Sequence, residues 1–299
     1  MARKTKGYWE KRSTELMLQL EKGTERTIDS LIEAYEQATR NINKEIANIF
    51  NKYATDGKLT TQEAMELLSV KETKQFYNNL LEQINSIENT DIRKKLLAKY
   101  NAPAYVYRIS RYEALQENID IELKKLAKLE QDITKIRYVD TIKEGYYHTI
   151  YDIQKGLGIG FNFSQIDMKT INMMLAENWI DKSNFSKRIW NNNEKLGSYI
   201  KTKLTADTMS GKSVQKISRE LSQYMEVGLY NATRLVRTEV NHFANEAEML
   251  SYEECDVEKY RFIATLDKIT CEHCAELDNK VFNVKDRKPR QKLSSNTFK

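Results

Sequence analysis

The chain has 299 residues, and its 48 Lys and Arg against 43 Asp and Glu give a formal net charge of +5. With 40% hydrophobic and 30% charged residues, it is polar for a globular protein but too apolar for a disordered one. Only 10 glycines and 2 prolines are present, which excludes collagen-like and turn-dense all-β architectures. The scarcity of helix breakers predicts a mainly α-helical fold built from long helices.

The sequence also limits where the protein acts. Its longest uncharged apolar run is far shorter than the ~20 residues that span a bilayer, so we expect no membrane partner. No apolar stretch follows the basic residues 1–6, so no secretory signal is predicted. Three cysteines are too few for a disulfide framework, which indicates a reducing cytoplasm. Charges of both signs are interspersed, which favours a solvated helical surface over a DNA-reading face.

The N-terminal half shows helical periodicity. Apolar residues recur at alternating spacings of three and four between Trp9 and Tyr53, which predicts one long helix with a single buried stripe. A capping box predicts a short helix over 60–68, and further helices are predicted over 72–100 and from 105 to about 136, with 138–153 as an optional continuation. These segments form a predicted helical N-terminal domain, residues 1–160.

A glycine cluster, Gly156-Leu-Gly-Ile-Gly160, closes this domain. Its spacing does not match a dinucleotide-binding loop, because the third glycine comes one residue early and no helix opens directly behind it. We interpret the cluster as a turn between two lobes.

The second lobe is predicted to be helical and to end in a small β-hairpin knuckle. Short helices are expected near 167–177 and 185–204. Ser213 is expected to cap a helix that Gly228 ends, and another helix follows over 231–253. The periodicity then changes to two, which predicts strands over 260–266 and 281–284. The second domain is predicted over residues 161–284 and a basic C-terminal tail over 285–299.

The sharpest local motif is Cys271-Glu-His-Cys274. Two cysteines at this spacing provide half of a tetrahedral zinc site, and two further soft ligands would be needed. We interpret the motif as a structural turn with no cofactor and keep an incomplete zinc site at Cys271 and Cys274 as the alternative. Glu239 and His242 have the Glu-x-x-His spacing of di-iron bundles, but no second copy exists. We therefore expect His242 to be a partly exposed hydrogen-bonding residue.

Catalytic signatures are missing from the sequence. It contains no nucleophile elbow, phosphate loop, zinc-protease motif or paired acid–base pattern. On this basis the protein is predicted not to be an enzyme.

An ordered series of motifs in the C-terminal third resembles a known family. The series runs from Gly211-Lys-Ser-Val214 through Arg237-Thr-Glu239 to Asp267 and Thr270-Cys-Glu-His-Cys274. As a set, it is similar to the phage Mu protein F-like head morphogenesis family, the minor head proteins of tailed phages. Two positions depart from the family's glycines, with Asp256 before the first strand and Asn279 in the later turn. Asn tolerates the left-handed backbone, so the later turn is expected to form, whereas Asp tolerates that backbone less well.

The resemblance implies a phage minor capsid protein that acts in head morphogenesis. It implies portal protein and capsid or scaffold proteins as partners, and a place in the capsid interior of the virion after assembly in the host cytoplasm. Non-specific contact with packaged DNA and a part in DNA ejection are also implied. The alternative is a DNA-binding assembly or ejection factor that uses the Cys-x-x-Cys knuckle and the basic tail. A third possibility, a toxin or other enzyme relative, is opposed by the missing active-site motifs and by the short stretch after Val284.

The resemblance also suggests a structural polar network. Arg237, Glu239 and Asp267 are candidates for a buried cluster that holds the last helix against the hairpin, and an ordinary solvated helix face is the alternative. If these groups are buried, each charge must be paired, because an isolated buried charge is far too costly.

Overall fold

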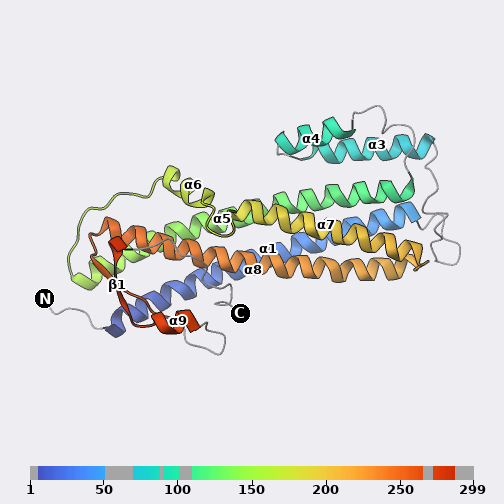
Figure 1. Cartoon of the computed structure of the whole chain (residues 1–299). Coiled ribbons are helices and arrows are strands. Elements are labelled where there is room, and N and C mark those ends of the chain that lie inside the picture. Colours follow the sequence, from blue (N-terminus) through green and yellow to red (C-terminus); the bar gives the residue numbers. More distant parts are fainter. Residues whose placement is uncertain (1–5, 51–69, 88–89, 101–109, 265–271, 287–299) are drawn as a thin grey trace. The chain divides into compact units, whose positions relative to one another are not determined.

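The computed structural model describes residues 6–50, 70–87, 90–100, 110–264 and 272–286. Within these ranges the chain is predominantly helical, with one two-stranded antiparallel sheet near the C-terminal end (Figure 1). This confirms the predicted mainly α fold with a small β-hairpin. The predicted helix over 60–68 lies outside the described residues. In the part of the chain that the structure describes, no helix is both long enough and apolar enough to cross a membrane.

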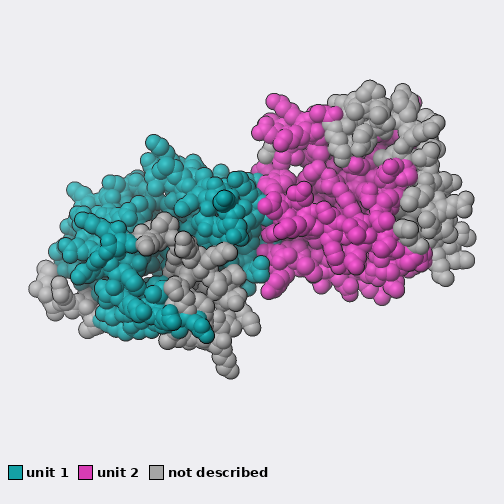
Figure 2. All heavy atoms as spheres, viewed as in Figure 1, with its two compact units in different colours: residues 1–31, 131–188, 232–299 teal, residues 32–130, 189–231 magenta. Residues whose placement is uncertain are grey.

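The chain divides into two compact units that are interleaved in sequence (Figure 2). Unit 1 comprises residues 1–31, 131–188 and 232–299, and unit 2 comprises residues 32–130 and 189–231. Four long helices contribute residues to both units: α1 (Lys6–Phe50), α5 (Arg111–Leu157), α7 (Phe185–Met209) and α8 (Val214–Glu254). The domains predicted from sequence follow one another along the chain, and their boundaries stay predictions.

Small residues let α5 and α8 approach each other closely in unit 1. A Cβ atom added at Gly145 of α5 would lie only 3.1 Å from the Cβ of Ala247 and 3.5 Å from the carbonyl oxygen of Ala244, both on α8. One turn further along, the Ser251 hydroxyl donates to the Tyr146 carbonyl oxygen over 3.0 Å. The two helices are therefore joined by backbone-level contacts as well as by apolar packing.

The predicted turn at the glycine cluster is confirmed. Helix α5 ends at Leu157, and Gly158 adopts a left-handed conformation with φ of 69°. The Ile159 amide then donates back to the Gln154 carbonyl oxygen over 3.2 Å, which closes the helix end in a Schellman pattern. Beyond the turn, α6 (Met168–Ala176) begins at Asp167, whose side chain accepts from the Thr170 amide.

The hairpin has the predicted antiparallel pairing. Strand β1 (Lys259–Arg261) pairs with β2 (Val281–Asn283), with Tyr260 opposite Phe282. Helix α9 (Glu272–Leu277) lies between the strands in sequence, and a short 3-10 turn, η3 (Val284–Asp286), follows β2. Asn279 adopts a φ of 63°, which confirms the turn expected there, and Asp256 adopts a φ of 51° although Asp tolerates the left-handed backbone less well than Asn.

The helix predicted over 72–100 is in fact two helices in unit 2, which corrects the sequence interpretation. Helix α3 (Val70–Asn85) ends in a turn where the Ser86 hydroxyl donates to the Gln83 carbonyl oxygen, and α4 (Thr90–Tyr100) follows. The interruption lets the two short helices share a core. Its buried members are Leu80, Ile84, Ile87, Leu96 and, from α5, Ile121.

A second correction concerns Gly228, which was predicted to end a helix. Helix α8 instead runs without interruption from Val214 to Glu254. A Cβ atom added at Gly228 would lie 2.6 Å from Leu196 Cδ2 and 3.0 Å from Tyr35 Cε1. The glycine therefore allows close packing of α8 against its neighbours in unit 2 and does not act as a helix stop.

The conformation of Gly158 gives a direct test of the helix-ending turn. We expect Gly158→Ala to lower the free energy of unfolding by about 1–2 kcal/mol, because an L side chain is strained in the left-handed region. Urea titration followed by circular dichroism measures the change.

Gly160→Ala is the matched control, since no atom lies within 4 Å of a Cβ added there and its φ is not positive. Its expected effect is neutral or slightly stabilising. Equal destabilisation by both variants would contradict the described turn.

Candidate functional site

A buried carboxylate lies in the middle of α8. Glu239 is 0% exposed, although ionised carboxylates are rarely buried unless they are paired. An Arg188 guanidinium nitrogen forms an ion pair with Glu239 Oε1, and Trp179 Nε1 donates to Glu239 Oε2 over 2.9 Å. Both carboxylate oxygens therefore have a partner, one charged and one neutral.

An aromatic stack covers this ion pair. The ring of Trp179 lies parallel to that of His242, with centroids 3.9 Å apart and an interplanar angle of 11°. The Arg188 guanidinium carbon lies 5.1 Å from the Trp179 ring centroid, within cation–π range. Glu239 and His242 are three residues apart on α8, so their side chains lie on the same face of the helix. Trp179 therefore contacts His242 through its ring and Glu239 through its indole nitrogen.

This arrangement corrects the expectation for His242. The side chain was predicted to be partly exposed, but the residue is only 9% exposed. Its ring is also 5.2 Å from that of Phe243, so it has aromatic neighbours on two sides. A histidine three residues after a buried glutamate packs here as part of the core of unit 1.

Trp179 and Arg188 are brought to Glu239 by a tight turn. Asp181 and Lys182 both have positive φ, 48° and 55°, and the Ser183 amide donates to the Ile180 carbonyl oxygen over 2.8 Å. Two consecutive left-handed residues are the pattern of a type I′ turn, which favours Gly and Asn. Such positions cost about 1–3 kcal/mol each and persist where the surrounding structure determines them. Here the contacts of Trp179 before the turn and of Arg188 after it hold these two positions in the left-handed conformation.

The start of α7 then fixes Arg188. Asn184 caps the helix, because its side-chain oxygen accepts from the Lys187 amide over 3.0 Å. Burial lowers the pKa of the Arg188 guanidinium to about 10, which still leaves it charged at neutral pH. Beside it, the Tyr138 ring contacts Phe185 at 5.0 Å and Phe243 at 5.2 Å. We call Glu239, Arg188, Trp179 and His242 the buried latch of unit 1.

The structure does not bring Arg237 to Glu239. The two residues are two positions apart on α8, so their side chains point in different directions. Arg237 instead donates to Glu25 of α1 over 2.8 Å, in a pair that is partly exposed. Asp267 lies outside the described residues, so the three-residue network stays a prediction.

The cysteine motif is equally untested. Cys271 lies outside the described residues, and Cys274 is in α9 without a described side chain. Among the described residues, no three His, Cys, Asp or Glu side chains lie close enough together to hold a metal ion. The zinc alternative therefore stays a prediction as well.

Sequence reasoning missed Arg188 and Trp179 as partners of Glu239. They precede Glu239 by 51 and 60 positions in the printed sequence. Helical periodicity reports which residues share a face of one helix, and it carries no information about partners at such separations. The requirement that a buried charge be paired was the one available signal, and it predicted a partner without naming it.

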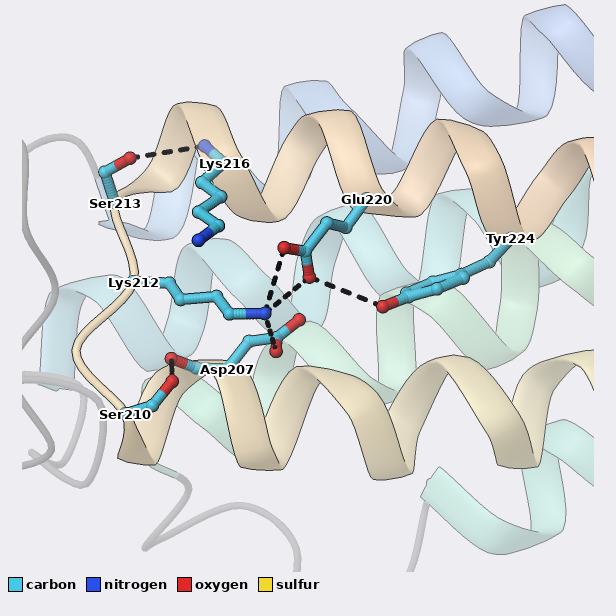
Figure 3. Close-up of polar contacts among 7 residues, drawn as sticks. All are labelled: Asp207, Ser210, Lys212, Ser213, Lys216, Glu220 and Tyr224. Atoms are coloured by element: carbon cyan, nitrogen blue, oxygen red, sulfur yellow. Dashed lines mark hydrogen bonds and ion pairs between the residues drawn. The ribbon is translucent and has the colours of Figure 1, made fainter.

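A second polar cluster lies at the turn between α7 and α8 in unit 2 (Figure 3). Gly211 is left-handed with φ of 65°, and the Lys212 amide donates to the Asp207 carbonyl oxygen over 3.1 Å. Lys212 Nζ lies between two carboxylates, 2.6 Å from Asp207 Oδ1 and 2.7 Å from Glu220 Oε2. The Ser213 hydroxyl accepts from the Lys216 amide, which confirms the predicted helix cap.

The chemistry of this turn is that of an ion-pair clamp. Hydrogen bonds that Lys212 donates to Asp207 and Glu220 raise its pKa, so its amine stays protonated. The same lysine lowers the pKa of the Glu220 carboxyl. A lysine that serves as a base or nucleophile needs the opposite shift. The clamp therefore links the end of α7, through Asp207, to the start of α8, through Glu220. The motif Gly211-Lys-Ser-Val214 lies between these two helix ends.

Comparison with known proteins confirms the family resemblance. Residues 198–299 match the family described as Phage Mu protein F like protein. The matched segment contains the clamp, Glu239 and the hairpin, whereas Trp179 and Arg188 precede it. This match supports a role in phage head morphogenesis.

A curated relative corrects one prediction. The chain is 25% identical over 191 residues to NAD(+)--arginine ADP-ribosyltransferase EFV of Enterococcus faecalis (strain ATCC 700802 / V583). The alignment covers 58% of this chain and 39% of that protein, so the chain spans about two-fifths of the relative's length. No solved structure matches. The prediction of a non-enzymatic protein is contradicted by this relative, which is named as a transferase, and a search for short catalytic motifs does not detect such overall similarity.

The buried latch predicts that substitutions of Glu239 and of Arg237, two nearby residues of α8, differ in how much they lower the free energy of unfolding. We expect Glu239→Gln to lower the free energy of unfolding by about 3–5 kcal/mol, because Arg188 would be left as an unpaired buried cation. Arg237→Ala, the matched control, should cost less than about 1 kcal/mol, since its pair with Glu25 is partly exposed.

Chemical denaturation measures both variants, and Trp179 fluorescence reports locally once Trp9 and Trp190 are replaced by Phe. Similar small losses for the two variants would contradict the latch.

Proposed function

We propose that this chain, whose residues 198–299 belong to the Phage Mu protein F like family, is a minor head protein that binds the portal and inner capsid during head assembly. In this proposal it acts through docking of its helical surfaces and remains inside the capsid of the finished virion. The family match carries the assignment to head morphogenesis. The portal, the capsid interior and a part in DNA ejection are the proposed extensions.

The buried latch is the observation that best supports a docking role. A pre-organised surface binds more tightly than a flexible one, because less conformational entropy is lost on association. The Glu239–Arg188 pair, the Trp179–His242 stack and the turn at Asp181 hold the segment before α7 in one conformation. The proposed docking surface adjoins this fixed segment in sequence.

Exposed apolar side chains on unit 1 give that surface its chemistry. Large hydrophobic side chains are exposed from the end of α5 through α6, whereas such groups are normally buried. Tyr147 and Phe163 are in ring contact at 6.3 Å and are both exposed. The exposed members of this patch are Tyr147, Leu157, Ile159, Phe163, Met168 and Met173. We call this set the α5–α6 patch and propose that it docks on portal or capsid protein.

Packaged DNA is a second proposed partner, bound without sequence specificity. The net charge of +5 is modest, and acidic and basic residues are mixed along the chain. Such a surface tolerates a nearby phosphate backbone without reading base edges. The alternative of a dedicated DNA-binding factor depends on Cys271, Cys274 and the tail 285–299, of which only residues 285 and 286 have described side chains.

The transferase relative supplies a second candidate function, favoured by the 25% identity over 191 residues. That activity would transfer ADP-ribose from NAD+ to arginine. Incubating the purified chain with labelled NAD+ and an arginine analogue tests it. Label on the acceptor would establish the activity, and no label above a protein-free blank would remove this candidate.

The head role predicts a specific loss of association. In procapsids isolated during infection, the chain should co-purify with portal protein. We expect Phe163→Glu together with Met173→Glu to reduce the ratio of chain to portal at least about fivefold, because charge is introduced into an apolar contact. Quantitative mass spectrometry of the isolated particles measures this ratio.

Lys169→Glu is the matched control, since it places the same side chain on an exposed position of α6 outside the α5–α6 patch. Its ratio should stay at the wild-type value. A chain absent from procapsids would overturn the proposal. Binding to DNA that falls steeply with salt, with no portal association, would favour the DNA-binding alternative.

A further inference from the structure

Unit 2 contains a buried carboxyl group that neither the latch nor the clamp uses. Glu130 of α5 is 1% exposed. Its Oε2 accepts from the Tyr35 hydroxyl of α1 over 3.0 Å and from Asn193 Nδ2 of α7 over 3.1 Å. A single side chain therefore bridges three helices, and both of its hydrogen-bond donors are neutral.

The remaining polar atoms of Glu130 and Asn193 include two hydrogen-bond acceptors but no free donor. Glu130 Oε1 and Asn193 Oδ1 are both buried and have no hydrogen-bond partner. Both hydrogens of the Asn193 amide are already engaged, by Glu130 Oε2 and by the Ile189 carbonyl oxygen. Two acceptors cannot bond to each other, and buried unsatisfied acceptors are costly. A proton on Oε1 would turn that atom into a donor and remove one of the two unsatisfied acceptors.

Among the residues that the structure describes, the two groups that bond to Glu130 are neutral. The titratable group that faces Glu130 from α1 is Tyr35, whose pKa is raised well above its ordinary value by burial and by Glu130 itself, so it stays neutral. From α7 the facing group is Asn193, an uncharged amide. Of the lysines nearby on α5 in the described part of unit 2, Lys124 is paired with Asp120 and Lys125 with Glu122.

We propose that Glu130 is a proton-dependent lock, protonated when it joins α1, α5 and α7 of unit 2 and weakening that junction when it ionises. Its surroundings fit the neutral acid, because Glu130 Oε1 is buried without a donor and, among the described residues, the groups that bond to Glu130 are neutral. Ionisation would leave a buried carboxylate supported by two neutral donors alone.

The pH range of the lock follows from the same surroundings. Burial raises the pKa of Glu130 from 4.5 to about 7, although the bonds from Asn193 and Tyr35 act in the opposite direction. The folded chain therefore holds this proton more tightly than the unfolded chain does between these values. The stabilising contribution is complete below pH ~4.5, falls as the pH rises through this range, and is lost above pH ~7.

Glu130→Gln tests the lock, because the glutamine amide imitates the protonated acid and cannot ionise. At pH 8 the folding equilibrium constant of the variant should exceed that of the wild-type chain by on the order of 100-fold, and the two should converge near pH 4.5. Glu122→Gln is the matched control on the same helix. Glu122 pairs with Lys125 over 3.1 Å, so its replacement should leave the fall in stability between pH 5 and 7 in place.

Infrared difference spectroscopy of the wild-type chain provides a readout that does not depend on a folded variant. We expect a protonated carboxyl band that is present at pH 5.5, disappears by pH 8 and is missing from the Glu130→Gln spectrum. Parallel stability profiles for wild type and Glu130→Gln, or no band that titrates in this range, would overturn the proposal. The head role and the lock fail independently, since neither experiment on portal association involves Glu130.

Discussion

One buried charge determines how the parts of unit 1 are held together. Glu239 is completely removed from solvent, and a carboxylate in that position is stable only with a cation and hydrogen-bond donors around it. Arg188 supplies the cation and Trp179 a donor. Because these partners come from the segment on either side of a tight turn, satisfying one carboxylate also fixes the turn, the start of α7 and the stacking of Trp179 on His242.

The buried latch also includes residues that lie outside the segment matching the family. The matched segment begins at residue 198 and includes Glu239, but both of its partners precede that point. A domain cut at the family boundary would leave the buried carboxylate without its cation. The relative named as an ADP-ribosyltransferase aligns over 191 residues, which is longer than the family match itself. The similarity to that enzyme thus extends over more of the chain than the family match does.

Local features of the fold were predictable from sequence because their causes are local. Periodic apolar residues predicted the long helices, and the Ser213 cap and the turn at Asn279 followed from short-range chemistry. The prediction that Gly228 ends a helix was wrong, because a glycine that ends a helix and one that permits close packing look alike in sequence. The interruption between α3 and α4 was missed because no proline or glycine marks it.

The candidate site was predictable only in part, and the reason is physical. The family motif singled out Glu239, and charge pairing required that a buried Glu239 have partners. Their identity depends on which segments pack together in three dimensions, and that is not written in the spacing of residues along one helix. The non-enzymatic prediction failed for a related reason, because it relied on short motifs alone.

The most direct test of the central claim is a double-mutant cycle between Arg188 and Glu239, using Arg188→Met, Glu239→Gln and both together. If the two charges depend on each other, each single variant should be strongly destabilised and the double variant should lose much less than their sum, with a coupling energy of about 2 kcal/mol or more. Additive losses, with no coupling beyond about 0.5 kcal/mol, would show that the buried carboxylate is stabilised without Arg188 and would contradict the account.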